Sequence, residues 1–455
     1  MISDMTTGDT YKVLFKFSLY IAAGNMLQQL YNLADFYILG RCAGVNAMAA
    51  VGSASNSVGL LINIAVGMNM GTNVVIASSF GKRSIQQVKN GIKTGILMAA
   101  IIGIVFTILG LMFTGWILDV TNTPVELLND ANTYLRIYFC GLVFLFLFNI
   151  IIAISQALGD SKTSFYSLII SSVINIILDI YLVKYRNMGV KGAAIATVVS
   201  EIICFIFVAV MLVKLVAQLN GTQVYKYDIN EQQKIIKESV PAVLQRSVIA
   251  IGVTLMQSLI NQYGINVMAG YTAASKIFGL VSLPVMDIGN AVTIYTAQNL
   301  GANKKERIKE GIFAAIVLDI GFSLIILILV FGFGKQMLTF FISDDSNIEA
   351  IGFGLRYLRI ICVFQIIQGM LQVYNGVIRG ASDVTGFVGS FMLNLSARVG
   401  FGYALAYMFG LRYIPYAMPI GWAVGLVTGY IRYAKLFYVS KAEHLRQVLK
   451  AKVIN

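Results

Sequence analysis

The sequence predicts an all-α membrane protein with twelve transmembrane helices, arranged as two parallel six-helix bundles. Of its residues 58% are hydrophobic and only 12% are charged, which is about half the charged fraction of a soluble protein. The apolar residues gather in long blocks with almost no charge, such as Ile96–Trp116 and Gly311–Gly334. A helix of about 20 apolar residues crosses a hydrocarbon core roughly 30 Å thick. The two halves of the chain also resemble each other.

Twelve apolar segments can be counted along the chain. The N-terminal stretch has no cleavage site of the secretory type, so the first segment is expected to remain as a membrane helix. Several segments are long for a simple span, which predicts tilted or kinked helices. The segments cover residues 11–34, 47–76, 91–114, 132–157, 164–184, 190–215, 238–262, 267–299, 311–334, 353–378, 385–409 and 415–439.

The net charge of +13 comes largely from alternate loops. Lys82 and Arg83 follow the second segment, Lys304 and Lys305 follow the eighth, and the C-terminal tail is basic. Cytoplasmic loops carry such an excess of Lys and Arg. We therefore expect a plasma-membrane protein with both termini in the cytoplasm, and no nucleic-acid partner. The loop between the fifth and sixth segments disagrees, because it carries Lys184, Arg186 and Lys191 on the expected outer side.

An internal repeat relates the two halves at an offset of 220 residues. NAMAAVGSASNSVGLL from Asn46 aligns without a gap with NVMAGYTAASKIFGLV from Asn266, and Ser78–Ile92 aligns with Gln298–Ile312. Six helices per repeat is an even number, so both halves begin on the same side of the membrane. Parallel repeats of this kind are a common transporter design, with the substrate site near the bilayer midplane.

The repeat divides the chain into two lobes of similar length. The predicted N-terminal lobe covers residues 1–217 and the C-terminal lobe covers 238–455. Between them, residues 218–237 are polar and form the predicted cytoplasmic linker.

Enzyme classes are excluded by elimination. The single histidine, His444, lies in the tail, and the chain has neither a DDxxD run nor a GxxxxGK[ST] loop. Transport must then be driven by an ion gradient or by a partner, because the chain carries no nucleotide-binding loop of that type. The cysteines are far apart and form no CxxC pair, so free thiols are expected rather than a disulfide or a metal site. They are Cys42, Cys140, Cys204 and Cys362.

Ionisable residues within membrane spans are the default site candidates, because burying them costs free energy. In the first half these are Asp35, Asp179 and Glu201. Asn175 precedes Asp179 by one helical turn, and Thr197 precedes Glu201 by one turn, so each pair shares a helix face. Such a set of carboxylate, amide and hydroxyl oxygens suits Na⁺, or a proton shared between two acids. Na⁺ at Asp35 and Asp179 is the only metal ion expected.

Each candidate also has a plainer structural interpretation. Asp35 could cap the end of its helix beside Arg41, and Asp179 could pair with Lys184 or Arg186. The remaining three could make hydrogen bonds between helices or reach towards the membrane surface.

The second half carries different intramembrane charges. At the repeat offset Leu255 lies opposite Asp35, and Arg398 lies roughly opposite Asp179. Lys276 and Arg398 could neutralise Asp287, or they could line a path for an anionic substrate group. The unequal charges indicate that cation coupling belongs to the first lobe. Pro284 should kink the eighth segment, because proline removes a backbone hydrogen bond. The charges are Arg246, Lys276, Asp287, Asp319 and Arg398.

These residues resemble the multidrug and toxic compound extrusion family of cation-coupled exporters. The resemblance rests on LYNLADFYILGRCAG at Leu30–Gly44, QALGDSKTSF at 156–165, NIILDIYLV at Asn175–Val183 and MGVKGAAIAT at Met188–Thr197. It extends over essentially the whole chain. It implies a V-shaped pair of six-helix lobes that export amphipathic, often cationic drugs by alternating access, against H⁺ or Na⁺ entry and without a further cofactor.

The resemblance also implies roles for particular residues. It assigns Asp35, Asn175, Asp179 and Thr197 to the cation-coupling site. The possible accessory charges, which follow from their place within the spans and not from the resemblance, are Glu201, Lys276, Asp287 and Arg398. The sequence departs from the family at Ile180, where many members have proline, and in the seventh segment, which contains no acid.

The predicted function is therefore antiport of a small molecule by a monomer in the lipid bilayer. A flippase or exporter of a lipid-linked or amphipathic metabolite is the alternative on the same architecture. A structural membrane protein is the third class, and for it neither Asp35 nor Asp179 would matter.

Overall fold

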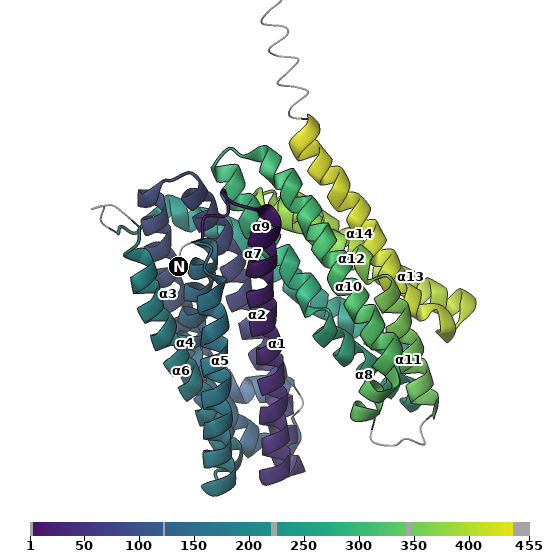
Figure 1. Ribbon diagram of the computed structural model, residues 1–455. Helices are drawn as coiled ribbons and strands as arrows, with labels where there is room; N and C mark the ends of the chain where they lie inside the picture. The colour runs from purple at the N-terminus through teal and green to yellow at the C-terminus, as the bar shows by residue number, and fades with distance from the viewer. Residues whose placement is uncertain (1–2, 122, 220–224, 343–347, 440–455) are drawn as a thin grey trace, which may run out of the picture. The chain divides into compact units, whose positions relative to one another are not determined.

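The computed structural model describes residues 3–121, 123–219, 225–342 and 348–439. Within these ranges the chain forms helices joined by short turns, with no strand among them (Figure 1). His444, the basic C-terminal tail and part of the expected linker lie outside the described residues.

The first half of the chain folds into long helices joined by tight turns. A short 3₁₀ turn precedes α4 at Val125–Leu127, and a π-helical segment, η2, follows α5 at Ile180–Tyr185. The helices are α1 (Thr10–Cys42), α2 (Val45–Gly81), α3 (Ile85–Val120), α4 (Leu128–Ala157), α5 (Ser161–Asp179) and α6 (Gly189–Val216).

The second half follows the same order, with two of its spans divided by bends. A 3₁₀ turn at Leu411–Tyr416 precedes α14, and a π-helical segment at Lys435–Val439 follows it. The helices are α7 (Ile229–Asn261), α8 (Ile265–Val281), α9 (Leu283–Gly301), α10 (Lys305–Phe341), α11 (Ile348–Val363), α12 (Gln365–Gly380), α13 (Val384–Phe409) and α14 (Ala417–Ala434).

The twelve predicted spans correspond to these helices. Within the described ranges, eight helices are long and apolar enough to cross a membrane, and two bent pairs, α8 with α9 and α11 with α12, bring the number to ten. The remaining long helices are α1, with 33 residues, and α13, with 26. At about 1.5 Å per residue both exceed the roughly 30 Å of a hydrocarbon core. The all-α fold of twelve spans is confirmed.

The bend expected at Pro284 is present. The axes of α8 and α9 differ by 43° at a break at Ser282, two residues before the proline. Pro284 has no N–H to donate to the carbonyl one turn earlier, so the helix opens there. The 49° bend between α11 and α12 has no proline beside it, and no residue pattern there predicts its position.

The chain divides into two compact units, each described here by itself. The first contains residues 1–8, 16–247 and 301–303, and the second contains 9–15, 248–300 and 304–455. The division between them falls within α7, after Ser247, and the helix itself begins at Ile229, inside the segment expected as a linker.

The repeat is visible in the backbone of the turns. Gly44 and Gly264, which are 220 residues apart, precede α2 and α8 with the same φ of 94°. This left-handed conformation favours glycine, because a Cβ atom would be strained there. Arg83 and Asn303, also 220 apart, have φ of 60° and 58° after α2 and α9. Two parallel six-helix repeats therefore share their turn geometry as well as their sequence.

The fifth helix of each repeat is capped at its N-terminus by one aspartate. Asp160 accepts from the Thr163 N–H at the start of α5, and Asp383 accepts from the Gly386 N–H at the start of α13. Each supplies an acceptor to an otherwise unpaired N–H of the first turn.

These caps correct the predicted register of the two helices. The cap positions, 160 and 383, set an offset of 223 in this region. The counterpart of Arg398 is then Asn175, and the counterpart of Asp179 is Gly402. The sequence alignment had placed Arg398 opposite Asp179, one helical turn away, because it did not allow for the longer connection in the second half.

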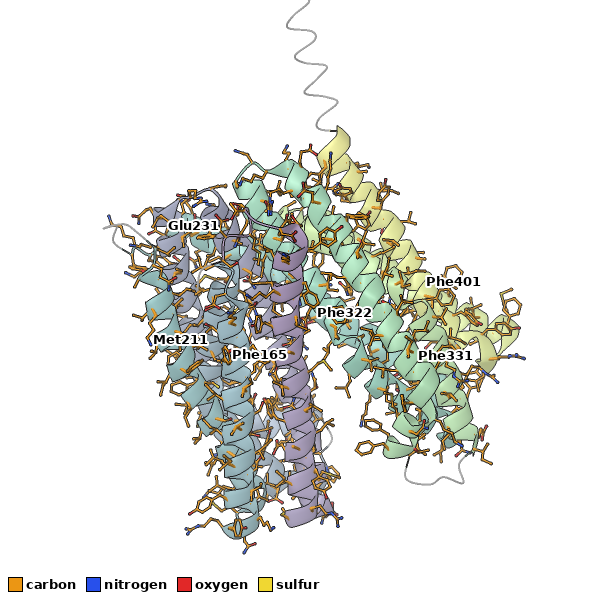
Figure 2. All side chains as sticks on the ribbon, in the orientation of Figure 1. Phe165, Met211, Glu231, Phe322, Phe331 and Phe401 are labelled. Atoms are coloured by element: carbon orange, nitrogen blue, oxygen red, sulfur yellow. The ribbon has the colours of Figure 1, made fainter. Side chains whose placement is uncertain are left out.

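Each unit has its own apolar core. In the first unit, Ala50, Leu135 and Leu142 belong to a buried cluster between α2 and α4, and in the second Ile277 and Trp422 belong to one that includes α8 and α14. Large apolar side chains also cover the outer surfaces, among them Phe331 and Phe401 (Figure 2). Exposed apolar surface of this kind is expected where lipid is the solvent.

Candidate functional site

Two carboxyl groups from different helices meet inside the first unit. Asp35 lies two turns before the end of α1, and Asp179 is the last residue of α5. Their side chains lie within hydrogen-bonding distance of each other, so they form a hydrogen bond when one of them carries the proton. Asp179 is completely buried, and Asp35 is partly buried. The structure thus brings together the two acids that the sequence singled out.

The amide of Asn175 lies one turn before Asp179 and is also completely buried. Neither its Oδ1 nor its Nδ2 has a hydrogen-bond partner among the described residues. The same holds for Asp35 Oδ1 and for both carboxylate oxygens of Asp179 when the acids are ionised. Leaving a buried polar atom unpaired costs about 1–3 kcal/mol, and more for a charged group. Five such atoms in one place indicate a site that is satisfied by something bound.

The helix changes its winding directly after Asp179. Residues Ile180–Tyr185 form η2, in which the Arg186 N–H bonds to the Tyr181 carbonyl, five residues earlier. π-Helical turns are rare and occur frequently at functional sites. η2 begins at Ile180, the position where many family members have proline. The wider π-helical winding alters the end of the helix there without a proline.

The structure gives no support to the plainer interpretations of the two acids. Among the described residues, neither Lys184 nor Arg186 forms an ion pair with Asp179, and Lys184 lies instead over the ring of Tyr185 at 5.6 Å. Arg41 lies over the Tyr37 ring, 6.0 Å from its centroid. The two acids therefore have each other as neighbours rather than basic partners.

Three tyrosines that the sequence did not single out surround the acids. Tyr134 and Tyr138 on α4 are buried and stack with their ring centroids 6.0 Å apart. Tyr31 on α1 lies near both Asp35 and Glu201. Tyr134 and Tyr138 are one turn apart on α4, and this spacing is visible in the sequence. Tyrosines at that spacing are, however, common in ordinary helix packing.

Glu201 and Thr197, both on α6, are placed differently from the carboxyl pair. Tyr138 Oη donates to Glu201 Oε1 across 3.5 Å, which is long for such a bond. The Thr197 hydroxyl donates to the Ala193 carbonyl at 3.1 Å within its own helix. This bond uses the donor of Thr197 and leaves its oxygen able to accept or to ligate. α6 packs against α4, which carries Tyr134 and Tyr138, and against α5, which carries Asp179.

The accessory charges of the second unit lie on three helices, α8, α9 and α13. The Asp287 carboxylate is buried and accepts from Asn290 Nδ2 at 3.1 Å. Lys276 is exposed on α8. Arg398 on α13 lies near Tyr357, and its Nε has no acceptor among the described residues.

Comparison with known protein families and proteins agrees with this architecture. The family model described as MatE matches residues 21–181 and 241–408, which is well over half of the chain. A Bacillus subtilis protein named "Probable multidrug resistance protein YpnP" is 30% identical over 379 residues, covering 83% of this chain and 84% of that protein. A Thermotoga maritima protein named "Probable multidrug resistance protein NorM" is 25% identical, covering 82% and 80% of the two chains.

Solved structures share the same fold. A structure described as "Crystal structure of MATE in complex with MaL6" superposes with a TM-score of 0.90 at 22% identity, covering 96% of this chain and 99% of that one. A transporter from Pyrococcus furiosus, whose description reports a binding pocket of reverse polarity, superposes with a TM-score of 0.88 at 23% identity, covering 95% and 98%. The chain is a multi-pass membrane protein and belongs to the multidrug and toxic compound extrusion family of transporters.

Proposed function

We propose that this protein is a secondary active multidrug exporter that moves amphipathic, cationic small molecules out of the cell in exchange for entering H⁺ or Na⁺. The cation binds at Asp35 and Asp179, with Asn175 and Thr197 as neutral oxygen ligands. Substrate and cation favour different states of the protein, so each promotes release of the other. Both termini face the cytoplasm, and the protein acts as a monomer, since the first unit contributes every residue of this site.

The observation that carries the proposal is the contact between the Asp35 and Asp179 carboxyl groups beside the unpartnered Asn175 amide. Two carboxylates this close in an apolar surrounding do not both remain ionised, because the repulsion and the loss of hydration act together. A proton or a Na⁺ ion neutralises the pair and satisfies the unpaired oxygens. Occupancy of this site would then decide which conformation of the first unit has the lower free energy.

Export of drugs is supported by the names of the relatives, two of which are called multidrug resistance proteins. Coupling to an ion gradient is supported by the sequence, which contains no GxxxxGK[ST] nucleotide-binding loop.

The test is efflux of ethidium from proteoliposomes under an imposed pH gradient and, separately, under a Na⁺ gradient. We expect efflux with at least one gradient, and a loss of gradient dependence in both Asp35→Asn and Asp179→Asn. Asp119→Asn, which changes an exposed acid at the end of α3, is the matched control and should transport normally. No gradient-driven flux of ethidium or of norfloxacin would contradict the proposal.

A second candidate function is export or flipping of an amphipathic metabolite with an anionic group. Arg398 favours it, since its Nε lacks an acceptor and a guanidinium binds carboxylate or phosphate strongly. Under this alternative an anionic amphiphile such as a lipid phosphate would compete with ethidium, and Arg398→Gln would remove that competition. Competition by cationic compounds alone would favour the drug exporter.

A further inference from the structure

The connection between α5 and α6 carries basic residues that no described group neutralises. Lys184 lies in η2, Arg186 directly follows it, and Lys191 lies in the first turn of α6. All three are exposed, and none forms an ion pair with a described residue. This connection departs from the positive-inside pattern of the other loops, so its basic residues need a different explanation.

The backbone of this connection is held in place by the core of the first unit. Val183 and Val190, on either side of the turn, are buried in one apolar cluster with Leu39 near the end of α1. The turn between them has φ of 51° at Asn187 and 53° at Gly189, both in the left-handed region. The basic side chains therefore project from a folded turn that is fixed on the end of the bundle.

A fourth basic residue, Arg41, lies at the end of α1 beside this turn and is also exposed. A Cβ atom at Gly189 would lie 3.9 Å from the Ala43 Cβ atom, so the chain that follows α1 contacts the turn. Arg41 is six residues beyond Asp35, and Lys184 is five residues beyond Asp179. Both basic residues are thus roughly 8 Å further along their helices than the acid pair. We call the following four residues the basic cluster: Arg41, Lys184, Arg186 and Lys191.

The acids at this end of the first unit do not neutralise the basic cluster. They are on the connection between α3 and α4, at Asp119, Glu126 and Asp130. None of them forms an ion pair with a described basic residue, and neither does Asp35 or Asp179. An anion from outside the chain would therefore meet four positive charges without displacing an ion pair of the described protein.

Exposed tyrosines and apolar side chains continue from the basic cluster along the outside of α5. Tyr185 and Tyr181 are 67% and 51% exposed, and Ile177 and Val173 are 59% and 50% exposed. Their four-residue spacing places them along one face of the helix. Tyrosine is enriched at the level of lipid head groups, with acyl chains beside the apolar residues further in. The order of basic, aromatic and apolar side chains matches an anionic amphiphile rather than a soluble anion.

We propose that the basic cluster binds the phosphate of an anionic phospholipid, whose acyl chains cover the exposed face of α5 at Val173 and Ile177. Each basic residue beside an anionic lipid surface strengthens binding about fivefold. The guanidinium groups of Arg41 and Arg186 can each form two hydrogen bonds with phosphate oxygens. The lipid joins the ends of α1 and α5 beyond the acid pair. This binding depends neither on the transported substrate nor on which side of the membrane this end faces.

Lipid binding to the purified full-length protein tests the proposal without any transport. Native mass spectrometry from mixed detergent micelles counts the molecules of phosphatidylglycerol and of uncharged phosphatidylcholine bound per chain. We expect the wild type to prefer phosphatidylglycerol. In the double variant Lys184→Gln with Arg186→Gln, its affinity should fall about thirtyfold, since two charges are removed. The matched control, Lys335→Gln with Arg412→Gln, removes two exposed basic residues of the second unit that form no ion pair with a described residue. It should bind as the wild type does.

A conservative variant separates the role of charge from folding. Lys184→Arg with Arg186→Lys keeps both charges and should retain the preference for phosphatidylglycerol. Inorganic phosphate has the anionic group without acyl chains, so at millimolar concentration it should not displace the lipid; displacement would indicate a site for free anions and would overturn the proposal. Equal affinity for phosphatidylglycerol in the wild type and the Gln double variant would also overturn it. So would an equal loss in the control variant, or a wild type that binds the two lipids alike.

Discussion

Asp35 on α1 and Asp179 on α5 present their carboxyl groups to each other, with no basic residue of the described chain paired to either. Two helices that are far apart in sequence thus hold one shared charge site. Because neutralising that site changes the contact between α1 and α5, cation binding can be transmitted to the shape of the first unit.

The Asn175 amide should set the strength of cation binding. Asn175→Ala removes a buried oxygen beside the carboxyl pair without removing a hydrogen bond to the described protein. We expect the cation concentration for half-maximal ethidium efflux to rise about tenfold, corresponding to about 1.4 kcal/mol. Ser172→Ala, a buried change on the same helix, is the control and should have no such effect. A normal cation dependence in Asn175→Ala would remove the amide from the site.

The Asp383–Arg432 pair should stabilise the second unit in a pH-dependent way. Burial alone would raise the pKa of Asp383, but hydrogen bonds from the Arg432 guanidinium and the Gly386 N–H outweigh it and hold the pKa below its usual range. A lowered pKa in the folded state stabilises the protein above about pH 4, and this contribution is lost as the pH falls further.

Asp383→Asn tests this pair while keeping the helix cap, because asparagine caps as well as aspartate. We expect a loss of about 1–3 kcal/mol at pH 7, seen as a lower thermal midpoint in detergent. The difference from the wild type should shrink as the pH falls below about 4. In the double variant with Arg432→Gln the two losses should not add; full additivity would show that the pair does not interact.

Gly369 should tolerate no side chain. Gly369→Ala places a Cβ atom on the Asp319 carboxyl group, and overpacking of this kind costs about 1–3 kcal/mol. Gly321→Ala on α10 is the control, since a Cβ atom there meets nothing within 4 Å. Alanine in an open helix position should be neutral or slightly stabilising. Equal thermal midpoints for the two variants would contradict the close approach of α10 and α12.

The membrane fold and the acids of the first unit could be predicted because a spanning helix must be apolar, and a charged residue within it costs free energy. A charged residue such as Asp179 is conspicuous within an apolar block, and helical spacing then identifies Asn175. The tyrosines around them could not be singled out, since Tyr134 and Tyr138 look like ordinary helix packing. The change of offset between the two repeats, from 220 to 223, was also not visible in the sequence alignment. The correct counterpart of Arg398 is found only from the helix caps at Asp160 and Asp383.

Bends and buried partners were predictable only in part. Pro284 marked one bend, but the break at Phe364 has no local signal. Asp319 was recognised as an intramembrane charge, yet its surroundings depend on Gly369, about 50 residues further along the chain. Neighbours brought together by the packing of α10 on α12 are not encoded in the spacing of either helix.

Substrate binding to the purified protein gives the most direct test of the central claim that the Asp35–Asp179 pair exchanges its cation for substrate. Ethidium binding is measured by calorimetry in buffers of different ionisation enthalpy, and again over a range of Na⁺ concentrations. The account predicts that the wild type releases one more cation, as H⁺ or Na⁺, than either Asp35→Asn or Asp179→Asn. Equal release by all three proteins would contradict it.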